Sequence, residues 1–164
     1  MPVVLYRVDD RLVHGQVVES WVPHLKAGEL VVVSDAVAAD EVRRAIMRFA
    51  TPEDVELQIL TVQDAFAYLN GAPGARNILV LLPGLKEAAD LLSKGLQIPS
   101  LNIGGMHYSA GKNMSIGKAI FLSDDDCGLL KFLAGAGVEL EGRGVPSDRP
   151  INPMDALVGR SGGV

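Results

Sequence analysis

The sequence predicts an α/β fold in a single domain: an open, twisted, mostly parallel β-sheet with helices on both faces. Short apolar, β-branched runs alternate with segments of helical spacing, which is the pattern of successive βαβ units. Most of the early apolar runs are continuous, as is typical of strands covered on both faces. The 164 residues, 48% of them hydrophobic and 21% charged, are enough for one sizeable core.

Four strands are expected in the first half of the chain. They are Val3–Val8, Glu29–Ser34, Val55–Leu60 and Asn77–Leu82, of which only the third alternates between apolar and polar residues. Helical spacing of apolar residues follows them, at Val17–Leu25, Ala39–Phe49, Val62–Leu69 and Leu85–Leu92. Pro23 should end or kink the first helix, because proline has no backbone N–H to donate.

The second half of the chain is expected to continue the sheet and to add a longer helix. Further strands are predicted at Ser100–Gly105, Ala119–Ser123 and Val138–Val145. The segment Asp124–Gly137 opens with three acidic residues and closes with glycines, which suits the start and the end of a helix. Pro153 is placed to begin one short helical turn. We expect a domain over residues 1–158 and a flexible tail over residues 159–164.

Composition argues against several classes of partner and compartment. A formal net charge of −5 gives no basic face for nucleic acid or for an anionic membrane. Cys127 is the only cysteine, so neither an internal disulfide nor a multi-cysteine zinc site is expected. The N-terminus turns acidic within ten residues, and no stretch approaches the roughly 20 apolar residues of a membrane span. A cytoplasmic location is therefore expected.

The turn after the first predicted strand concentrates residues that can carry chemistry. It contains Asp9, Asp10, Arg11 and His14. In an open parallel sheet, ligands bind at this place, beyond the carboxyl ends of the strands. Gly15 would let the backbone approach a ligand closely, and a helix from about Gln16 would aim unpaired N–H groups and its positive end toward His14. We therefore expect the turn to bind an anion.

Three chemical roles are open to His14: general base, metal ligand, or nucleophile that carries a phosphoryl group. A metal would find only part of its ligands in Asp9, Asp10 and His14, and the guanidinium of Arg11 opposes a cation. The same guanidinium suits phosphoryl oxygens, so a phosphoryl carrier accounts for more of the turn. The residues alone leave two alternatives open: a solvated turn capped by His14, and a metal- or base-dependent hydrolase that uses Asp10 and His14.

A phosphoryl carrier gives each residue of the turn a physical task. His14 must be uncharged to attack phosphorus, and the positive charges of Arg11 and of the helix end disfavour the imidazolium form. Asp9 or Asp10 can hold the ring through its other nitrogen, or can hold Arg11 in place. Positioning and neutralisation of charge supply most of the catalysis, so no metal and no other cofactor is expected.

The segment "RVDDRLVHGQV" (Arg7–Val17) resembles the active-site loop of the IIB components of the mannose, fructose and sorbose branch of the bacterial sugar phosphotransferase system. The family pattern is approximately arginine, apolar, two aspartates, arginine, leucine, apolar, histidine, glycine, glutamine and apolar, and every position is present. The resemblance continues over Val31–Glu41, Leu101–Asp126 and Gly137–Asp148, which makes it span nearly the whole chain.

The resemblance implies a function and partners. His14 matches the histidine that accepts a phosphoryl group on Nδ1 from a IIA component and passes it to a sugar at the membrane IIC/IID permease. The sugar would be bound only at the permease, and the protein would be cytoplasmic, associated with the membrane through that permease. The remaining alternative on the same fold is a regulatory protein in which phosphorylated His14 is a signal and no sugar is moved.

Other loops at the same sheet edge are candidates for shaping the pocket. Ser34 and Asp35 follow the second predicted strand and could reach the same crevice, although an N-cap for the next helix is at least as good an explanation. The glycine-rich loop of residues 104–112 supplies Ser109 and Lys112, but it matches neither the P-loop nor the dinucleotide fingerprint. His107 in this loop is expected to be exposed and to carry no phosphoryl group.

Overall fold

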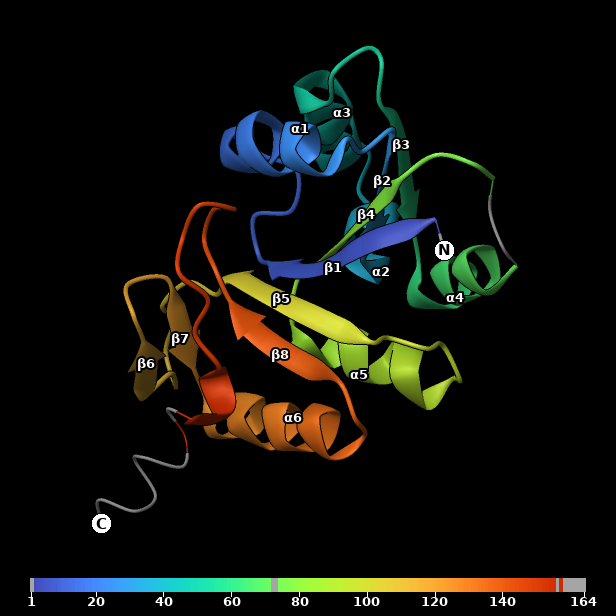
Figure 1. The fold of residues 1–164 in the computed structure, drawn as a ribbon. Helices are drawn as coiled ribbons and strands as arrows, with labels where there is room; N and C mark the ends of the chain where they lie inside the picture. Colours follow the sequence, from blue (N-terminus) through green and yellow to red (C-terminus); the bar gives the residue numbers. More distant parts are fainter. Residues whose placement is uncertain (1, 72–73, 156, 158–164) are drawn as a thin grey trace.

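A six-stranded sheet forms the centre of the computed structural model, which describes residues 2–71, 74–155 and 157 (Figure 1). All strand pairs in this sheet are parallel, and the strand order is β3-β2-β4-β1-β5-β8. The strands are β1 Val3–Asp9, β2 Glu29–Val33, β3 Glu56–Leu60, β4 Ile78–Leu82, β5 Ser100–Gly105 and β8 Glu139–Gly142. The predicted fold class, a mostly parallel sheet in one α/β domain, is confirmed.

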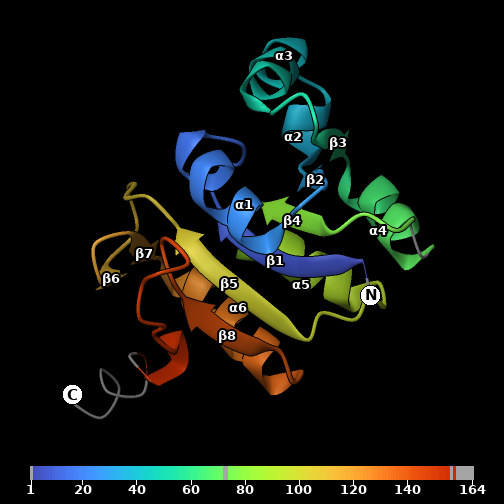
Figure 2. The same cartoon turned by 45° about the horizontal axis from the view of Figure 1, so that its top comes forward.

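Helices cover both faces of the sheet, as Figures 1 and 2 show. They are η1 Val17–Trp21 (a π-helix), α1 Val22–Leu25, α2 Asp35–Ala38, α3 Glu41–Ala50, α4 Val62–Asn70, α5 Leu85–Ser93 and α6 Asp124–Gly135. The connections after β1 and β2 run toward the β3 edge, and those after β3, β4 and β5 run the other way. Because crossovers between parallel strands are right-handed, opposite directions place the two sets of helices on opposite faces. None of the described helices is long and apolar enough to cross a membrane.

The protein has two hydrophobic cores, one on each face of the sheet, and the inner strands contribute side chains to both. In β4, Val80 and Leu82 belong to the core under α4, α5 and α6, whereas Leu79 and Leu81 belong to the core under η1, α1 and α3. Every residue of β2 and β4 is buried. This two-sided burial explains why these strands are continuous apolar runs in the sequence. The edge strand β3 is only partly buried, which agrees with its alternating pattern.

The first helical segment differs from the expected regular helix. It divides into the π-helix η1 and the short α1, which ends where Lys26 takes a left-handed φ of 51°. Pro23 does not end the segment where it stands, because it lies in the first turn of α1. A missing N–H costs least there, since amides of a first turn have no partner within their own helix.

Short elements account for the other differences from the predicted elements. The predicted strand Ala119–Ser123 is β7 (Ile120–Leu122), which pairs antiparallel with an unforeseen strand β6 (Met114–Ile116) outside the main sheet. The helix α2 was also not foreseen, and α3 begins two residues later than expected because Asp40 caps its first amides. The expected domain limit at 158 and the expected tail 159–164 lie outside the described residues.

Candidate functional site

The loop between β1 and η1 lies at the carboxyl edge of the sheet and is anchored by its own apolar residues (Figure 1). Leu12 and Val13 are buried in the core under η1 and α1. The Leu12 amide donates to the Asp9 carbonyl at 2.9 Å, and Leu12 takes a left-handed φ of 59°. Burial of that side chain offsets the strain of this backbone conformation. The polar residues of the loop are therefore presented from a fixed backbone.

His14 and Asp9 form the central contact of the loop. The Nε2 atom of His14 lies 2.9 Å from Oδ2 of Asp9. The Asp9 side chain is 0% exposed and that of His14 is 16% exposed. With the carboxylate accepting a hydrogen bond from Nε2–H, the lone pair of the uncharged ring is on Nδ1. No described residue hydrogen-bonds to Nδ1, so this nitrogen is available to a ligand.

The environment of Asp9 favours its ionised form. Burial raises the pKa of this carboxyl, but hydrogen bonds from His14 and from the Arg11 amide, together with the charges of His14 and Arg7, outweigh burial. The net result is a pKa below the ordinary value of an aspartate. Asp9 is thus a buried anion that can fix the tautomer of His14.

Arg11 lies beside Asp9 and across the first turn of the helical segment. Its amide donates to Asp9 Oδ1 at 3.1 Å, and its Nε lies 3.5 Å from the same oxygen. Its Nη2 donates to Oε1 of Gln16 at 3.0 Å, and the side chain is 44% exposed. Arg11 is therefore held in the loop while keeping part of its guanidinium open to solvent.

The helical segment begins directly at His14. The His14 carbonyl accepts a hydrogen bond from the Val18 amide at 3.1 Å, and Gly15 and Gln16 are already helical. A Cβ added at Gly15 would meet no heavy atom within 4 Å, so the space over this residue is open. The first amides of a helix have no intrahelical acceptor and attract anions.

Asp10 points to a different partner from Asp9. It accepts a hydrogen bond from the His107 amide at 2.6 Å and also contacts Nδ1 of the His107 ring. His107 is exposed, as expected, but it is fixed to Asp10 rather than free in its loop. Asp10 therefore connects the β1 loop with the loop after β5, and Asp9 alone of the two aspartates contacts His14.

Arg7 is the main residue of the site that sequence reasoning did not assign. Its side chain is fully buried in β1, where Nη2 lies 3.2 Å from Asp9 Oδ2. Its guanidinium also donates to Asn102 Oδ1 and, at 2.9 Å each, to the carbonyls of Arg143 and Gly144. Two signals in the sequence pointed to it: it is a charged residue within the apolar run "VVLYRV", and it is the first arginine of the motif "RVDDRLVHGQV".

Trp21 lies between two guanidinium groups. The Cζ atom of Arg7 is 4.9 Å from the centre of the indole ring, and that of Arg143 is 5.3 Å from it. The indole N–H donates to the Gly144 carbonyl at 3.0 Å. Trp21 is buried, and it joins η1 to the segment that follows β8.

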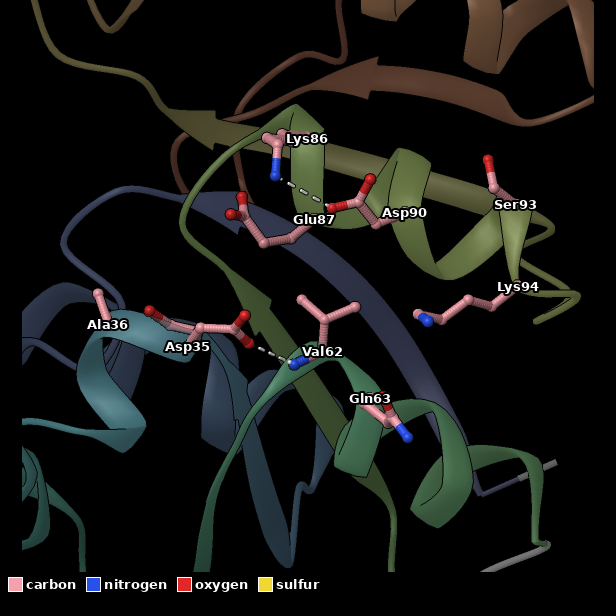
Figure 3. Close-up of a pocket in the computed structure, with 10 residues that line it drawn as sticks. Asp35, Ala36, Val62, Gln63, Lys86, Glu87, Asp90, Ser93 and Lys94 are labelled. Atoms are coloured by element: carbon pink, nitrogen blue, oxygen red, sulfur yellow. Dashed lines mark hydrogen bonds and ion pairs between the residues drawn. The ribbon is translucent and has the colours of Figure 1, made fainter.

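Ser34 and Asp35 belong to another part of the sheet edge than His14. Ser34 caps α2 by accepting a hydrogen bond from the Val37 amide, and Asp35 accepts one from the Val62 amide at 2.8 Å. Both line a cavity of about 660 Å³ between α2, α4 and α5, drawn in Figure 3. Its lining is Ser34, Asp35, Ala36, Val62, Gln63, Lys86, Glu87, Asp90, Ser93 and Lys94. None of these residues comes from the His14 loop, which corrects the expectation of a shared pocket.

Ser109 and Lys112 lie in the loop between β5 and β6. The Ser109 carbonyl accepts a hydrogen bond from the Lys112 amide at 3.1 Å, which closes a turn in the loop between β5 and β6. The Lys112 ammonium lies 3.6 Å from Oδ2 of Asp126, in the first turn of α6. Lys112 is thus paired with a carboxylate of α6.

The described residues contain no group of three or more histidine, cysteine, aspartate or glutamate side chains placed to hold a metal ion. The pairs formed by Asp9 with His14 and by Asp10 with His107 are separate pairs that point to different neighbours. The geometry therefore lends no support to the metal-dependent hydrolase.

Comparison with known proteins assigns the fold and this loop to one family. The family model described as "PTS system sorbose subfamily IIB component" matches residues 3–162. The chain belongs to this family. Membership gives this IIB component a phosphocarrier role in the sugar phosphotransferase system. The resemblance recognised in "RVDDRLVHGQV" is confirmed.

Relatives of this IIB component match it along almost its full length. The sorbose-specific EIIB component of Lacticaseibacillus casei is 36% identical over 98% of this chain and 99% of its own length. That of Klebsiella pneumoniae is 34% identical over 96% of both chains. The crystal structure of the IIBSor domain of the sorbose permease from Klebsiella pneumoniae is similar with a TM-score of 0.90 and 33% identity, over 97% of this chain and 98% of that one.

A longer relative contains a second component. The mannose-specific EIIAB component of Escherichia coli strain K12 is 32% identical over 96% of this chain, which covers 49% of that protein. The IIB component described here thus aligns with about half of a protein whose name joins the A and B components.

Proposed function

We propose that this IIB component carries the phosphoryl group on Nδ1 of His14, takes it from a IIA component and passes it to a sugar held by a membrane IIC/IID permease. The observation that supports this proposal most directly is the 2.9 Å contact between His14 Nε2 and the buried Asp9 carboxylate. This contact favours the tautomer with the proton on Nε2 and the lone pair on Nδ1. The corresponding activity is that of a protein-Nπ-phosphohistidine–sugar phosphotransferase.

The transfer consists of two displacements at phosphorus. First, the Nδ1 lone pair of His14 forms a bond to phosphorus as the bond to the donor nitrogen breaks. Second, a sugar hydroxyl oxygen attacks the same phosphorus, the Nδ1–P bond breaks, its electron pair returns to Nδ1, and the hydroxyl proton passes to water. Asp9 can accept a hydrogen bond from Nε2–H in both steps, so that the lone pair of the uncharged ring is on Nδ1, the nitrogen that attacks phosphorus.

The phosphoryl oxygens would be held by groups around the open side of His14. Arg11 offers the exposed part of its guanidinium, and Gly15 and Gln16 offer the first amides of the helical segment. The absence of a side chain at Gly15 keeps this space free. Positioning and charge neutralisation account for most of phosphoryl-transfer catalysis, so the mechanism needs no metal and no other cofactor.

The partners follow from the family and from one relative. A single protein name in Escherichia coli joins the A and B components, which supports a IIA protein as the phosphoryl donor. The acceptor would be the sugar bound at the permease, and the carrier would work in the cytoplasm at the inner face of the membrane. Its acidic net charge fits protein partners and gives no basis for nucleic-acid binding.

The decisive test is to map the phosphoryl group. The purified chain is incubated with phosphorylated IIA and analysed by mass spectrometry under alkaline conditions that preserve phosphohistidine. Label is expected on His14 and is expected to be lost in His14→Ala. His107→Ala is the matched control, because His107 lies on a neighbouring loop and should leave labelling of His14 in place. Stable label on His14→Ala would overturn the proposal.

A second arm of this experiment separates transport from signalling. Membranes that contain the IIC/IID permease and a sugar are added to the labelled protein. Loss of label from His14 with formation of sugar phosphate supports the carrier. Retention of label on His14 in the presence of an active permease supports the regulatory alternative.

A further inference from the structure

Arg7 contacts the oxygen of Asp9 that also faces His14. Its Nη2 lies 3.2 Å from Asp9 Oδ2, and the same Oδ2 lies 2.9 Å from Nε2 of His14. Arg7 itself makes no hydrogen bond to the ring, so any effect on His14 must pass through the carboxylate. One oxygen is thus shared between a buried cation and the imidazole.

The position of Arg7 is determined by contacts with three other segments of the chain. Asn102 in β5 accepts from Nη1, and the carbonyls of Arg143 and Gly144, after β8, accept from Nη1 and Nη2. The Trp21 ring of η1 covers the guanidinium at 4.9 Å. A Cβ added at Gly104 would come within 2.0 Å of the guanidinium, so this glycine provides the space for it. Such a guanidinium cannot turn away from Asp9 without losing buried hydrogen bonds.

The charge of Arg7 matters when His14 carries a phosphoryl group. A phosphoryl group on His14 adds close to two negative charges in the neighbourhood of the Asp9 anion. A buried carboxylate without a counter-ion would repel that group, because burial weakens screening by water. Arg7 offsets the charge of Asp9 at Oδ2, the oxygen that also faces His14. The other charged groups of this cluster are Arg11, on the other oxygen of Asp9, and Arg143, which is paired with Glu141 at 2.8 Å.

We propose that Arg7 is a positioning residue for the phosphoryl-carrying histidine: it fixes Asp9 in its ionised form and offsets its charge, which favours both the Nε2–H tautomer of His14 and the phosphorylated state. This inference deepens the proposed function and rests on it. Arg7 touches neither the ring nor the phosphoryl group and acts only through Asp9.

The first measurement is the equilibrium between His14 and its donor. The fraction of His14 that is phosphorylated is measured at a fixed ratio of phosphorylated to unphosphorylated IIA. Arg7→Gln is expected to lower the equilibrium constant about tenfold, because Asp9 loses its buried counter-ion. Arg7→Lys keeps the charge and is expected to recover most of this loss. Arg143→Gln is the matched control, since it disturbs the same cluster around Trp21 without touching Asp9.

The second measurement reports the tautomer directly. The imidazole ¹⁵N shifts of His14 are followed against pH in the unphosphorylated protein. In the wild type we expect a protonated Nε2 and an unprotonated Nδ1 in the uncharged ring, and in Arg7→Gln a mixture of the two tautomers. Because only folded protein gives the native signals, a loss of stability alone would not move these shifts.

A double-mutant cycle tests whether Arg7 acts through Asp9. In an Asp9→Asn background, Arg7→Gln is expected to leave the phosphorylation equilibrium unchanged, because its route to His14 is already removed. If Arg7→Gln does not fold, Arg7→Met, which also removes the charge, takes its place in the cycle and in both measurements with the same expected outcomes.

Two results would overturn the role of Arg7. One is an equilibrium constant and ¹⁵N shifts in Arg7→Gln that equal those of the wild type or of Arg143→Gln. The other is an undiminished effect of Arg7→Gln in the Asp9→Asn background. Absence of label from wild-type His14 would instead refute the proposed function, and the ¹⁵N measurement would still decide whether Arg7 sets the tautomer.

Discussion

Asp9 is a buried carboxylate whose two oxygens face three different residues. Oδ2 lies between Arg7 and His14, and Oδ1 accepts from the Arg11 amide. Burial opposes ionisation, but these partners hold the pKa of Asp9 below its ordinary value. A carboxyl whose pKa is lowered by folding stabilises the folded state above its unfolded pKa. This contribution is lost as the pH falls through the folded pKa.

We therefore predict that part of the acid sensitivity of this protein comes from Asp9. The free energy of unfolding, measured by urea denaturation, should fall with decreasing pH below about pH 4 to 5, by up to about 1.4 kcal/mol per pH unit for this one proton. Asp9→Asn should be less stable at neutral pH, because it leaves Arg7 without its counter-ion, but should show a shallower dependence in the acid range. Equal slopes in the two proteins would contradict this assignment.

Gly104 is the residue whose replacement should harm the interior of the site most. A Cβ at this position would lie 2.0 Å from the guanidinium of Arg7, which is held by hydrogen bonds and cannot yield. We expect Gly104→Ala to cost at least about 3 kcal/mol of unfolding free energy, as when a buried charged pair is broken. Gly128→Ala in α6 is the matched control: its Cβ meets nothing within 4 Å, and alanine should stabilise the helix by about 0.5–1 kcal/mol. Thermal unfolding of both variants checks the contrast.

Neighbouring residues of the loop show how far sequence could resolve the site. Asp9, Asp10 and His14 were all identified as candidates, but the sequence could not say which aspartate faces the histidine. The answer depends on where β1 ends: Asp9 still belongs to the strand and points inward, whereas Asp10 is in the turn and reaches His107. A difference of one residue at the end of β1 decides which aspartate faces His14, and the ends of an element are its least predictable part.

The helix α3 illustrates the same limit at the scale of an element. Its helical spacing was predicted, yet the spacing did not reveal which apolar side chains face inward. Met47 is buried, whereas Val42, Ile46 and Phe49 form an exposed stripe, with Phe49 95% exposed. A hydrophobic stripe on a helix is normally taken to face the core.

We predict very different losses of stability for two nearby positions of this helix. Phe49→Ser should change the free energy of unfolding by less than about 0.5 kcal/mol, because an exposed side chain loses little on removal. Met47→Ala should cost about 2–5 kcal/mol, because it leaves a cavity under the helix. Chemical denaturation of both variants measures these changes. A large loss of unfolding free energy in Phe49→Ser would mean that the stripe is covered in the native protein.

Strands were predictable where burial on both faces gives a continuous run of apolar residues in the sequence. The β2 and β4 runs are continuous because each strand is packed on two sides, and β5 was located at its observed ends. The three-residue β6 is too short to show a period, and the π-helical spacing of η1 departs from the regular helical period. Such elements depend on tertiary contacts, which a local pattern does not contain.

At the scale of the whole molecule, the site depends on contacts between distant parts of the chain. Arg7 reaches Asn102 and Gly144, which are 95 and 137 residues away in sequence. These residues meet because β1, β5 and β8 lie in succession within the sheet. The strands could be predicted from the sequence, but their order in the sheet could not. The contacts of Arg7 with Asn102 and Gly144 were therefore not predictable before the fold was known. The loop motif, being local, could be recognised.

The same sheet should make the two hydrophobic cores unfold together. Leu81 and Leu82 are adjacent and fully buried in β4, but they point into opposite cores. Trp21, the only tryptophan, reports on the core that contains Leu81. Because β4 cannot leave one core without leaving the other, we predict that Leu82→Ala lowers the urea midpoint of Trp21 fluorescence about as much as Leu81→Ala, with each variant losing about 2–5 kcal/mol. Far-UV circular dichroism should give the same midpoints. A Trp21 transition that stays at the wild-type midpoint in Leu82→Ala would show instead that the two faces unfold independently.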